Sequence, residues 1–110
     1  MKKLSKEEVL RIVRELHKCL DEIYGDRLKG VYLYGSYARG DARDDSDIDV
    51  AVVLAEPVSR SAETHRTVGV FSDICLQRHC LIIPFFLSEE EYRERPLAIF
   101  RSIAREGVLV

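Results

Sequence analysis

The sequence predicts a single α+β domain over residues 1–110, in which helices pack on a small mixed β-sheet in α/β-type layers. Three observations predict this fold class. A length of 110 residues supports one hydrophobic core. The composition, 46% hydrophobic and 33% charged, is that of an ordinary globular chain. Helical and extended patterns follow in the order helix, strand, strand, helix, strand, helix, and the helix between the second and third strands implies a mixed sheet.

The N-terminal part of the chain is predicted to form an amphipathic helix. Ser5 followed by Glu8 is a capping box that starts the helix, and Gly25 is suited to the left-handed residue that ends it. Apolar side chains recur between these limits at steps of three and four residues, at Val9, Leu10, Val13, Leu16, Leu20 and Ile23.

Two strands with a polar loop between them are predicted next. Residues 28–34 are rich in β-branched and aromatic side chains, which favours a strand. Residues 35–46 contain mainly Gly, Ser, Arg and Asp, which indicates a loop with one helical turn. In the second strand, 47–54, successive side chains point to opposite faces of the sheet. One face carries Ile48, Val50, Val52 and Leu54, and the other carries Asp47, Asp49, Ala51 and Val53.

The remaining chain supplies a helix, a third strand and a last helix. The helix is predicted from Ser59 to about Gln77, with an apolar face built from Val68, Phe71, Ile74 and Cys75. The third strand is predicted over 80–87, and Pro84 inside it indicates an edge position or a bulge.

Three local signals mark the last helix. Ser88 with Glu91 forms a second capping box. Pro96 suits the first turn of the last helix, and Gly107 suits its end.

Charge and cysteine content exclude several classes of function. The 17 Lys and Arg residues against 19 Asp and Glu residues give a formal net charge of -2, so no strong binding to nucleic acid or to an anionic membrane is expected. No spanning apolar run and no signal peptide is evident. The three cysteines, Cys19, Cys75 and Cys80, lack metal-ligand spacing and are expected to be reduced thiols. We therefore expect a cytoplasmic protein.

Gly35-Ser36, at the end of the first strand, suggests a phosphate-binding turn. Glycine allows backbone N–H groups to approach a phosphate closely, and the serine hydroxyl adds a donor. The alternative is an ordinary turn in which Ser36 caps a short helix.

Asp47 and Asp49 form a second candidate site. Separated by one residue on a strand, their carboxylates leave the same face. At about 5 Å and an effective dielectric constant near 20, they repel by about 3 kcal/mol. A divalent cation removes this repulsion, and oxygen ligands suit Mg²⁺ or Mn²⁺. The alternative is a pair of solvated aspartates.

Taken together, Gly35-Ser36 and the Asp47–Asp49 pair form a known sequence pattern. Gly35-Ser36, ten intervening residues and then Asp47-Ile48-Asp49 resemble the signature of the DNA polymerase β-like nucleotidyltransferase superfamily, most closely its minimal nucleotidyltransferase (MNT) domains. Arg39-Gly40-Asp41-Ala42-Arg43 strengthens the match, which covers residues 31–54.

The resemblance implies a polymerase β-like fold and a role for each matching residue. Gly35, Ser36 and Arg39 would bind the nucleotide, and Asp47 and Asp49 would be the catalytic residues that hold one or two Mg²⁺ ions, with Mn²⁺ as a substitute. The reaction would be in-line attack on the α-phosphate of ATP or another NTP. It would release pyrophosphate and leave a nucleoside monophosphate, AMP in the first instance, on a hydroxyl acceptor.

The resemblance also implies a partner. Minimal domains of this family act beside HEPN-domain proteins as antitoxins of toxin–antitoxin pairs, and the acceptor there is a tyrosine of the HEPN toxin. The apolar residues 81–87 are expected to belong to the core. The alternative is that Phe85-Phe86, near a sheet edge, contacts a partner in a homo- or hetero-oligomer.

One element of the family pattern is missing from the sequence. Fully equipped members carry a third carboxylate on a later strand, and residues 80–87 contain no acid. Three alternatives follow. An acid from elsewhere completes the site, the site works with two carboxylates, or the domain binds nucleotide or its partner without transferring a nucleotide.

Overall fold

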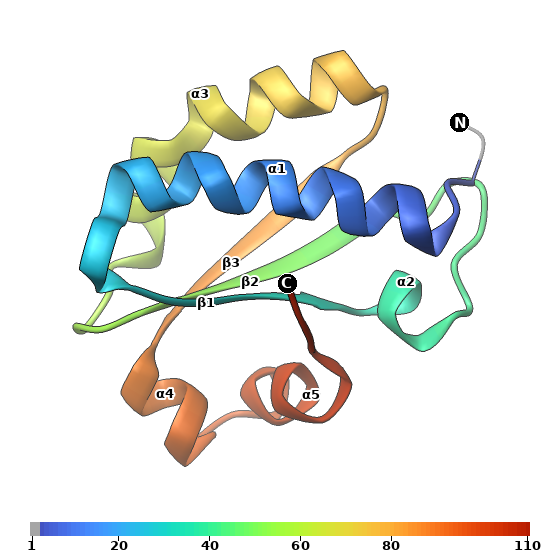
Figure 1. Ribbon diagram of the computed structural model, residues 1–110. Helices are drawn as coiled ribbons and strands as arrows, with labels where there is room; N and C mark the ends of the chain where they lie inside the picture. The colour runs from blue at the N-terminus through green and yellow to red at the C-terminus, as the bar shows by residue number, and fades with distance from the viewer. Residues whose placement is uncertain (1–2) are drawn as a thin grey trace.

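The structure is a computed structural model that describes residues 3–110, so the first two residues of the predicted domain lie outside it (Figure 1). The first half contains three long elements in the predicted order: α1 (Lys6–Tyr24), β1 (Leu28–Tyr34) and β2 (Ile48–Leu54). The short helix α2 (Ser36–Arg39) lies between β1 and β2. A 3-10 turn, Gly25–Arg27, joins α1 to β1. The second half contains α3 (Arg60–Arg78), β3 (Ile82–Ser88), α4 (Glu89–Glu94), α5 (Ala98–Glu106) and β4 (Val108–Leu109).

The four strands form one mixed sheet in the order β3-β2-β1-β4. β1 pairs antiparallel with β2 and with β4, whereas β2 pairs parallel with β3 through the crossover helix α3. β3 is therefore an edge strand, which confirms the prediction made from Pro84. In the parallel register, Asp49 lies opposite Ile83.

Helices cover both faces of the sheet, which gives the α+β layers that the sequence predicts. In Figure 1, α1 and α3 lie on one side of the sheet and α4 and α5 on the other. The alternation along β2 follows this division. The side chains of 48, 50, 52 and 54 join the core beneath α1 and α3, and Ala51 and Val53 join a second cluster with Phe100 and Ile103 of α5. Asp49 is two residues from Ala51 on the same strand, so its side chain lies on the face of the sheet that α5 covers.

The predicted helix ends are confirmed. The Ser5 hydroxyl accepts a hydrogen bond from the Glu8 N–H and the Glu8 carboxylate accepts one from the Ser5 N–H, which completes the capping box. Gly25 ends α1 with a φ of 55°. Ser88 and Glu91 form the second capping box, at the start of α4.

The C-terminal part differs from the prediction in two ways. Two short helices replace the single last helix, because Arg95 takes a left-handed conformation that ends α4. Pro96 lies between these helices, and the first helical residue of α5 is Ala98. Strand β4 was not predicted, because two residues after Gly107 carry no periodic signal and their pairing with Tyr32 and Leu33 of β1 is purely tertiary.

One prediction about apolar side chains was wrong. Val68 is 54% exposed, and the buried face of α3 is formed by Glu63, Thr67, Phe71 and Ile74. Glu63 is tolerated there because its carboxylate accepts hydrogen bonds from the Tyr24 hydroxyl and from Arg66.

The two residues suggested as a partner contact differ in exposure, and Phe85 is half-buried. Phe86 is completely buried, and Phe85 packs on Phe100 while Arg60 lies over both Phe85 and Phe100.

Within residues 3–110, no helix has both the length and the apolar character needed to cross a bilayer.

Candidate active site

A cleft of about 460 Å³ lies where β1 ends, between α2, the start of β2 and α5. Its lining brings together residues from three separate parts of the chain: Tyr34, Gly35, Ser36, Arg39, Asp49, Ile99, Ser102 and Glu106. Four of the five predicted site residues line this cleft. The fifth, Asp47, does not line it and is exposed just before β2 begins.

The Gly35–Ser36 turn joins the end of β1 to the start of α2. Gly35 adopts a φ of 77°, and its carbonyl accepts hydrogen bonds from the N–H groups of Ala38 and Arg39, both at 3.0 Å. Gly35, and not Ser36, is the N-cap of α2, so the alternative of a serine cap is wrong. The Ser36 hydroxyl makes no hydrogen bond to any described residue and lines the cleft, where it is available to a ligand.

Asp47 and Asp49 form an acidic pair at the start of β2. Burial of Asp49 raises its pKa above the ordinary range, and the negative charge of Asp47 raises it further, while Arg39 acts in the opposite direction. Neither aspartate has a salt bridge or a side-chain hydrogen bond to residues 3–110. Two such carboxylates at one end of a strand are electrostatically costly unless a cation lies between them.

These two carboxylates fit a Mg²⁺ ion that is shared with a substrate. Mg²⁺ is bound in proteins through one or two carboxylates, with substrate phosphates and water completing its coordination. The donors present are all oxygen atoms, as that ion prefers. Within the described residues, no three His, Cys, Asp or Glu side chains come together as a metal-binding group.

The cleft contains one acid that sequence reasoning missed. The Glu106 Oε1 accepts hydrogen bonds from the Gly35 N–H at 3.3 Å and from the Arg39 Nη1 at 3.1 Å. Gly35 and Glu106 are 71 residues apart in the sequence. The Arg-Glu-Gly turn at 105–107 was the only local signal, and it does not indicate which strand the turn meets.

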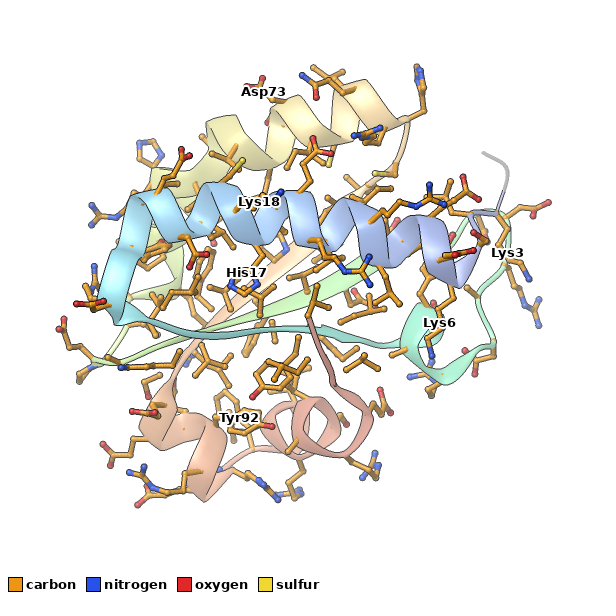
Figure 2. All side chains as sticks on the ribbon, in the orientation of Figure 1. Lys3, Lys6, His17, Lys18, Asp73 and Tyr92 are labelled. Carbon is orange, nitrogen blue, oxygen red and sulfur yellow. The ribbon has the colours of Figure 1, made fainter. Side chains whose placement is uncertain are left out.

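The other acids considered lie elsewhere. β3 contains none, and the residue opposite Asp49 is Ile83, whose side chain is 40% exposed. Asp73 is exposed on α3, and Figure 2 shows it on the side of that helix facing away from the sheet. Glu91 is held by Arg60 and caps α4. Glu106 is thus the acid from another part of the chain that approaches Asp49.

Two further side chains complete the polar lining. Burial raises the pKa of Tyr34 to about 12, and the negative charges of Asp49 and Glu106 add to this effect. The phenol is therefore neutral at physiological pH and able to donate a hydrogen bond. Arg39 bonds both Asp41 and Glu106, whereas Arg43 is exposed and does not line the cleft.

Comparison with known proteins gives consistent results. A family model described as nucleotidyltransferase domain matches residues 8–106. A candidate protein adenylyltransferase of Methanocaldococcus jannaschii is 35% identical over 77 residues, which cover 70% of this chain and 77% of that protein. Protein adenylyltransferase MntA of Thermococcus cleftensis is 43% identical over 56 residues, which cover 51% of this chain and 54% of that protein.

Solved structures share the fold. A candidate nucleotidyltransferase of Sulfolobus solfataricus superposes with a TM-score of 0.67 at 23% identity, covering 94% of this chain and 80% of that chain. A chain from a toxin–antitoxin complex with AMP-PNP superposes with a TM-score of 0.59 at 18% identity, covering 96% of this chain and 72% of that chain. At these identities the likeness is one of fold alone.

Proposed function

The chain belongs to the nucleotidyltransferase domain family, and we propose that it transfers AMP from ATP to a hydroxyl group of a partner protein. The observation that carries this proposal is the packing of Gly35 directly against Asp49. This packing joins the turn suited to phosphates to the carboxylate suited to a metal, in one cleft.

The residues that line the cleft and the neighbouring Asp47 have separate roles. Gly35, the Ser36 hydroxyl and Arg39 bind and orient the phosphates, and Asp47 and Asp49 would hold Mg²⁺. When bound, Mg²⁺ supplies positive charge to the triphosphate and to the departing pyrophosphate, and it favours deprotonation of the attacking hydroxyl. The acceptor oxygen bonds to the α-phosphorus as the bond to pyrophosphate breaks, and the hydroxyl proton leaves to solvent.

We further propose that the acceptor is a tyrosine of a HEPN-domain toxin and that this chain is the antitoxin. Two relatives support a protein acceptor, since both are described as protein adenylyltransferases. A chain of the same fold occurs in a toxin–antitoxin complex crystallised with AMP-PNP.

A second candidate function is neutralisation of the partner by contact, with nucleotide bound and not transferred. The specific observation in its favour is the lack of an acid on β3, where Ile83 lies opposite Asp49. The two functions differ in whether label from ATP becomes covalently attached to a protein.

The test is transfer of label from α-³²P-ATP, with Mg²⁺, into proteins of a soluble extract of the source cells. We expect one labelled protein with the wild type and none with Asp47→Asn/Asp49→Asn. Asp73→Asn is the matched control, because Asp73 is an exposed aspartate on α3 outside the cleft. No labelled protein, despite Mg²⁺-dependent binding of ATP, would contradict AMP transfer and favour neutralisation by contact.

A further inference from the structure

Glu106 occupies the two groups that the proposed function assigns to phosphate binding. One oxygen of its carboxylate accepts hydrogen bonds from both the Gly35 N–H and the Arg39 guanidinium. A carboxylate oxygen held by a backbone N–H and a guanidinium has the same recognition chemistry as a phosphate oxygen. The single Gly35 N–H cannot serve the carboxylate and a phosphate at the same time, and an N–H of the Arg39 Nη1 is used in the same way, while Arg39 keeps further N–H donors.

The position of Glu106 is fixed by the fold. It is the last residue of α5, a helix anchored by the completely buried side chains of Phe100 and Ile103. Directly after it, β4 pairs with β1, and the Val110 N–H donates to the Val31 carbonyl. The Glu106 side chain is only 15% exposed. The elements before and after Glu106, α5 and β4, therefore hold its side chain in the cleft, so it is not a freely exposed surface acid.

The location is electrostatically unfavourable for an acid. The C-terminal end of a helix carries a partial negative charge, so it favours cations and disfavours carboxylates. Asp49 lines the same cleft, and its pKa is raised in part by the negative charge of Glu106. The contacts with Arg39 and the Gly35 N–H compensate for this position, together with the Arg105 Nη2, which lies 3.8 Å from the Glu106 Oε2.

We propose that Glu106 is an internal competitor of the triphosphate, which a nucleotide must displace from Gly35 and Arg39 in order to bind. The inference rests on the proposed function, because it assumes that phosphates bind at these two groups. Its consequence is selectivity for polyphosphates. A triphosphate offers several charged phosphate oxygen atoms to replace one carboxylate, whereas a nucleoside without phosphates offers no charged oxygen atom.

The test is calorimetric binding of an ATP analogue whose α,β-bridging oxygen is a methylene group, so that no transfer occurs, in Mg²⁺ buffer. In Glu106→Gln the amide oxygen still accepts a hydrogen bond, but the negative charge is gone. We expect the Kd of the analogue to fall about tenfold, equivalent to about 1.4 kcal/mol. Inorganic tripolyphosphate should show the same gain, and adenosine should show none.

Two variants keep the result interpretable. Glu22→Gln makes the same change of charge on an exposed residue of α1, at the end of that helix far from α2 in Figure 1, and should leave every Kd unchanged. Glu106→Ala removes the carboxylate altogether and should also bind the analogue more tightly. Thermal unfolding followed by circular dichroism shows whether each variant is folded.

The outcomes separate the inference from the proposed function. If the wild type binds the analogue and the folded Glu106 variants bind it equally or more weakly, Glu106 does not compete and the inference is overturned. Equal gains for adenosine and the analogue would also overturn it, since the effect would not depend on phosphates. If neither the wild type nor any folded variant binds the analogue or tripolyphosphate, the proposed function itself fails, and the inference with it.

Discussion

The carboxylate of Asp49 lies in the space that a side chain on residue 35 would need. A Cβ atom placed on Gly35 would contact the Asp49 Oδ2 and would lie 3.1 Å from its Cγ. Gly35 also has a φ of 77°, in the left-handed region that favours glycine. Two independent constraints therefore require glycine where the proposed phosphate-binding turn meets the proposed metal ligand.

Gly35→Ala is expected to destabilise the fold and to abolish binding of ATP. The backbone conformation alone costs an alanine about 1–3 kcal/mol, and the added methyl group must also move Asp49. Urea denaturation measures the first effect and calorimetry the second.

Gly69→Ala is the matched control for this prediction. Gly69 lies within α3 with open space around it, so alanine should stabilise the protein by about 0.5–1 kcal/mol. A Gly35→Ala protein that unfolds at the wild-type urea concentration and binds ATP normally would show that the contact with Asp49 has no role.

The local parts of this arrangement could be predicted from the sequence. The alternation in β2 correctly places Asp49 on the face opposite Ile48 and Val50, and the glycine-serine pair correctly marks a turn into a short helix. Both signals depend on residues that are neighbours in the chain. The same is true of the capping boxes at Ser5 and Ser88.

The parts that depend on tertiary packing could not be predicted. Glu106 reaches Gly35 only because β4 pairs with β1 and turns α5 toward the start of β2. Val68 was placed on the buried face of α3 because it is apolar, but the face that meets α1 and the sheet contains Glu63, which Tyr24 and Arg66 satisfy. Neither long-range partner leaves a periodic signal in the sequence.

Arg39 and Arg43 are predicted to differ in their effect on nucleotide binding. Arg39 lines the cleft, whereas Arg43 is exposed in the following loop and does not. Arg39→Gln should raise the Kd for ATP about tenfold. Arg43→Gln, which removes the same charge, should leave it unchanged. Equal losses in calorimetric titrations of the two variants would indicate a diffuse effect of positive charge and no specific contact by Arg39.

Asp49→Asn is expected to separate stability from function. Burial and the neighbouring Asp47 both raise the pKa of Asp49, so its ionised form is unfavourable in the folded protein at neutral pH. Without Mg²⁺, the asparagine variant should therefore melt at or above the wild-type temperature, and it should lose Mg²⁺-dependent binding of ATP. Scanning calorimetry in EDTA and titration with Mg²⁺ test the two parts. A variant that melts much lower would show that Asp49 is a structural residue.

The Arg60–Glu91 pair is expected to make stability depend on pH. Burial alone would raise the pKa of Glu91, but hydrogen bonds from Arg60 and the Ser88 N–H outweigh it and hold this pKa below the ordinary value. The stabilisation is fully present above the unfolded-state pKa, about 4.3, and is lost as the pH falls through the lower folded-state value. Arg60 also lies over Phe100, so this pair helps to fix α5.

Glu91→Gln tests this dependence, since glutamine preserves the capping box at the start of α4. At pH 7 the variant should be less stable by up to about 1 kcal/mol, because Arg60 is partly exposed to solvent. The difference should disappear as the pH falls below 4.3. Glu90→Gln, an exposed neighbour, should show no such trend in urea denaturation. A constant difference at every pH would rule out the charge of Glu91 as its source.

The most direct test of the central claim compares ATP labelled at the α-phosphate with ATP labelled at the γ-phosphate in the same reaction. Transfer of AMP predicts that the α label appears on the acceptor protein and the γ label appears in pyrophosphate, with both signals lost in Asp47→Asn/Asp49→Asn. Appearance of the γ label on the acceptor would mean that the cleft transfers a phosphoryl group instead, and the assignment of this site to nucleotidyl transfer would be wrong.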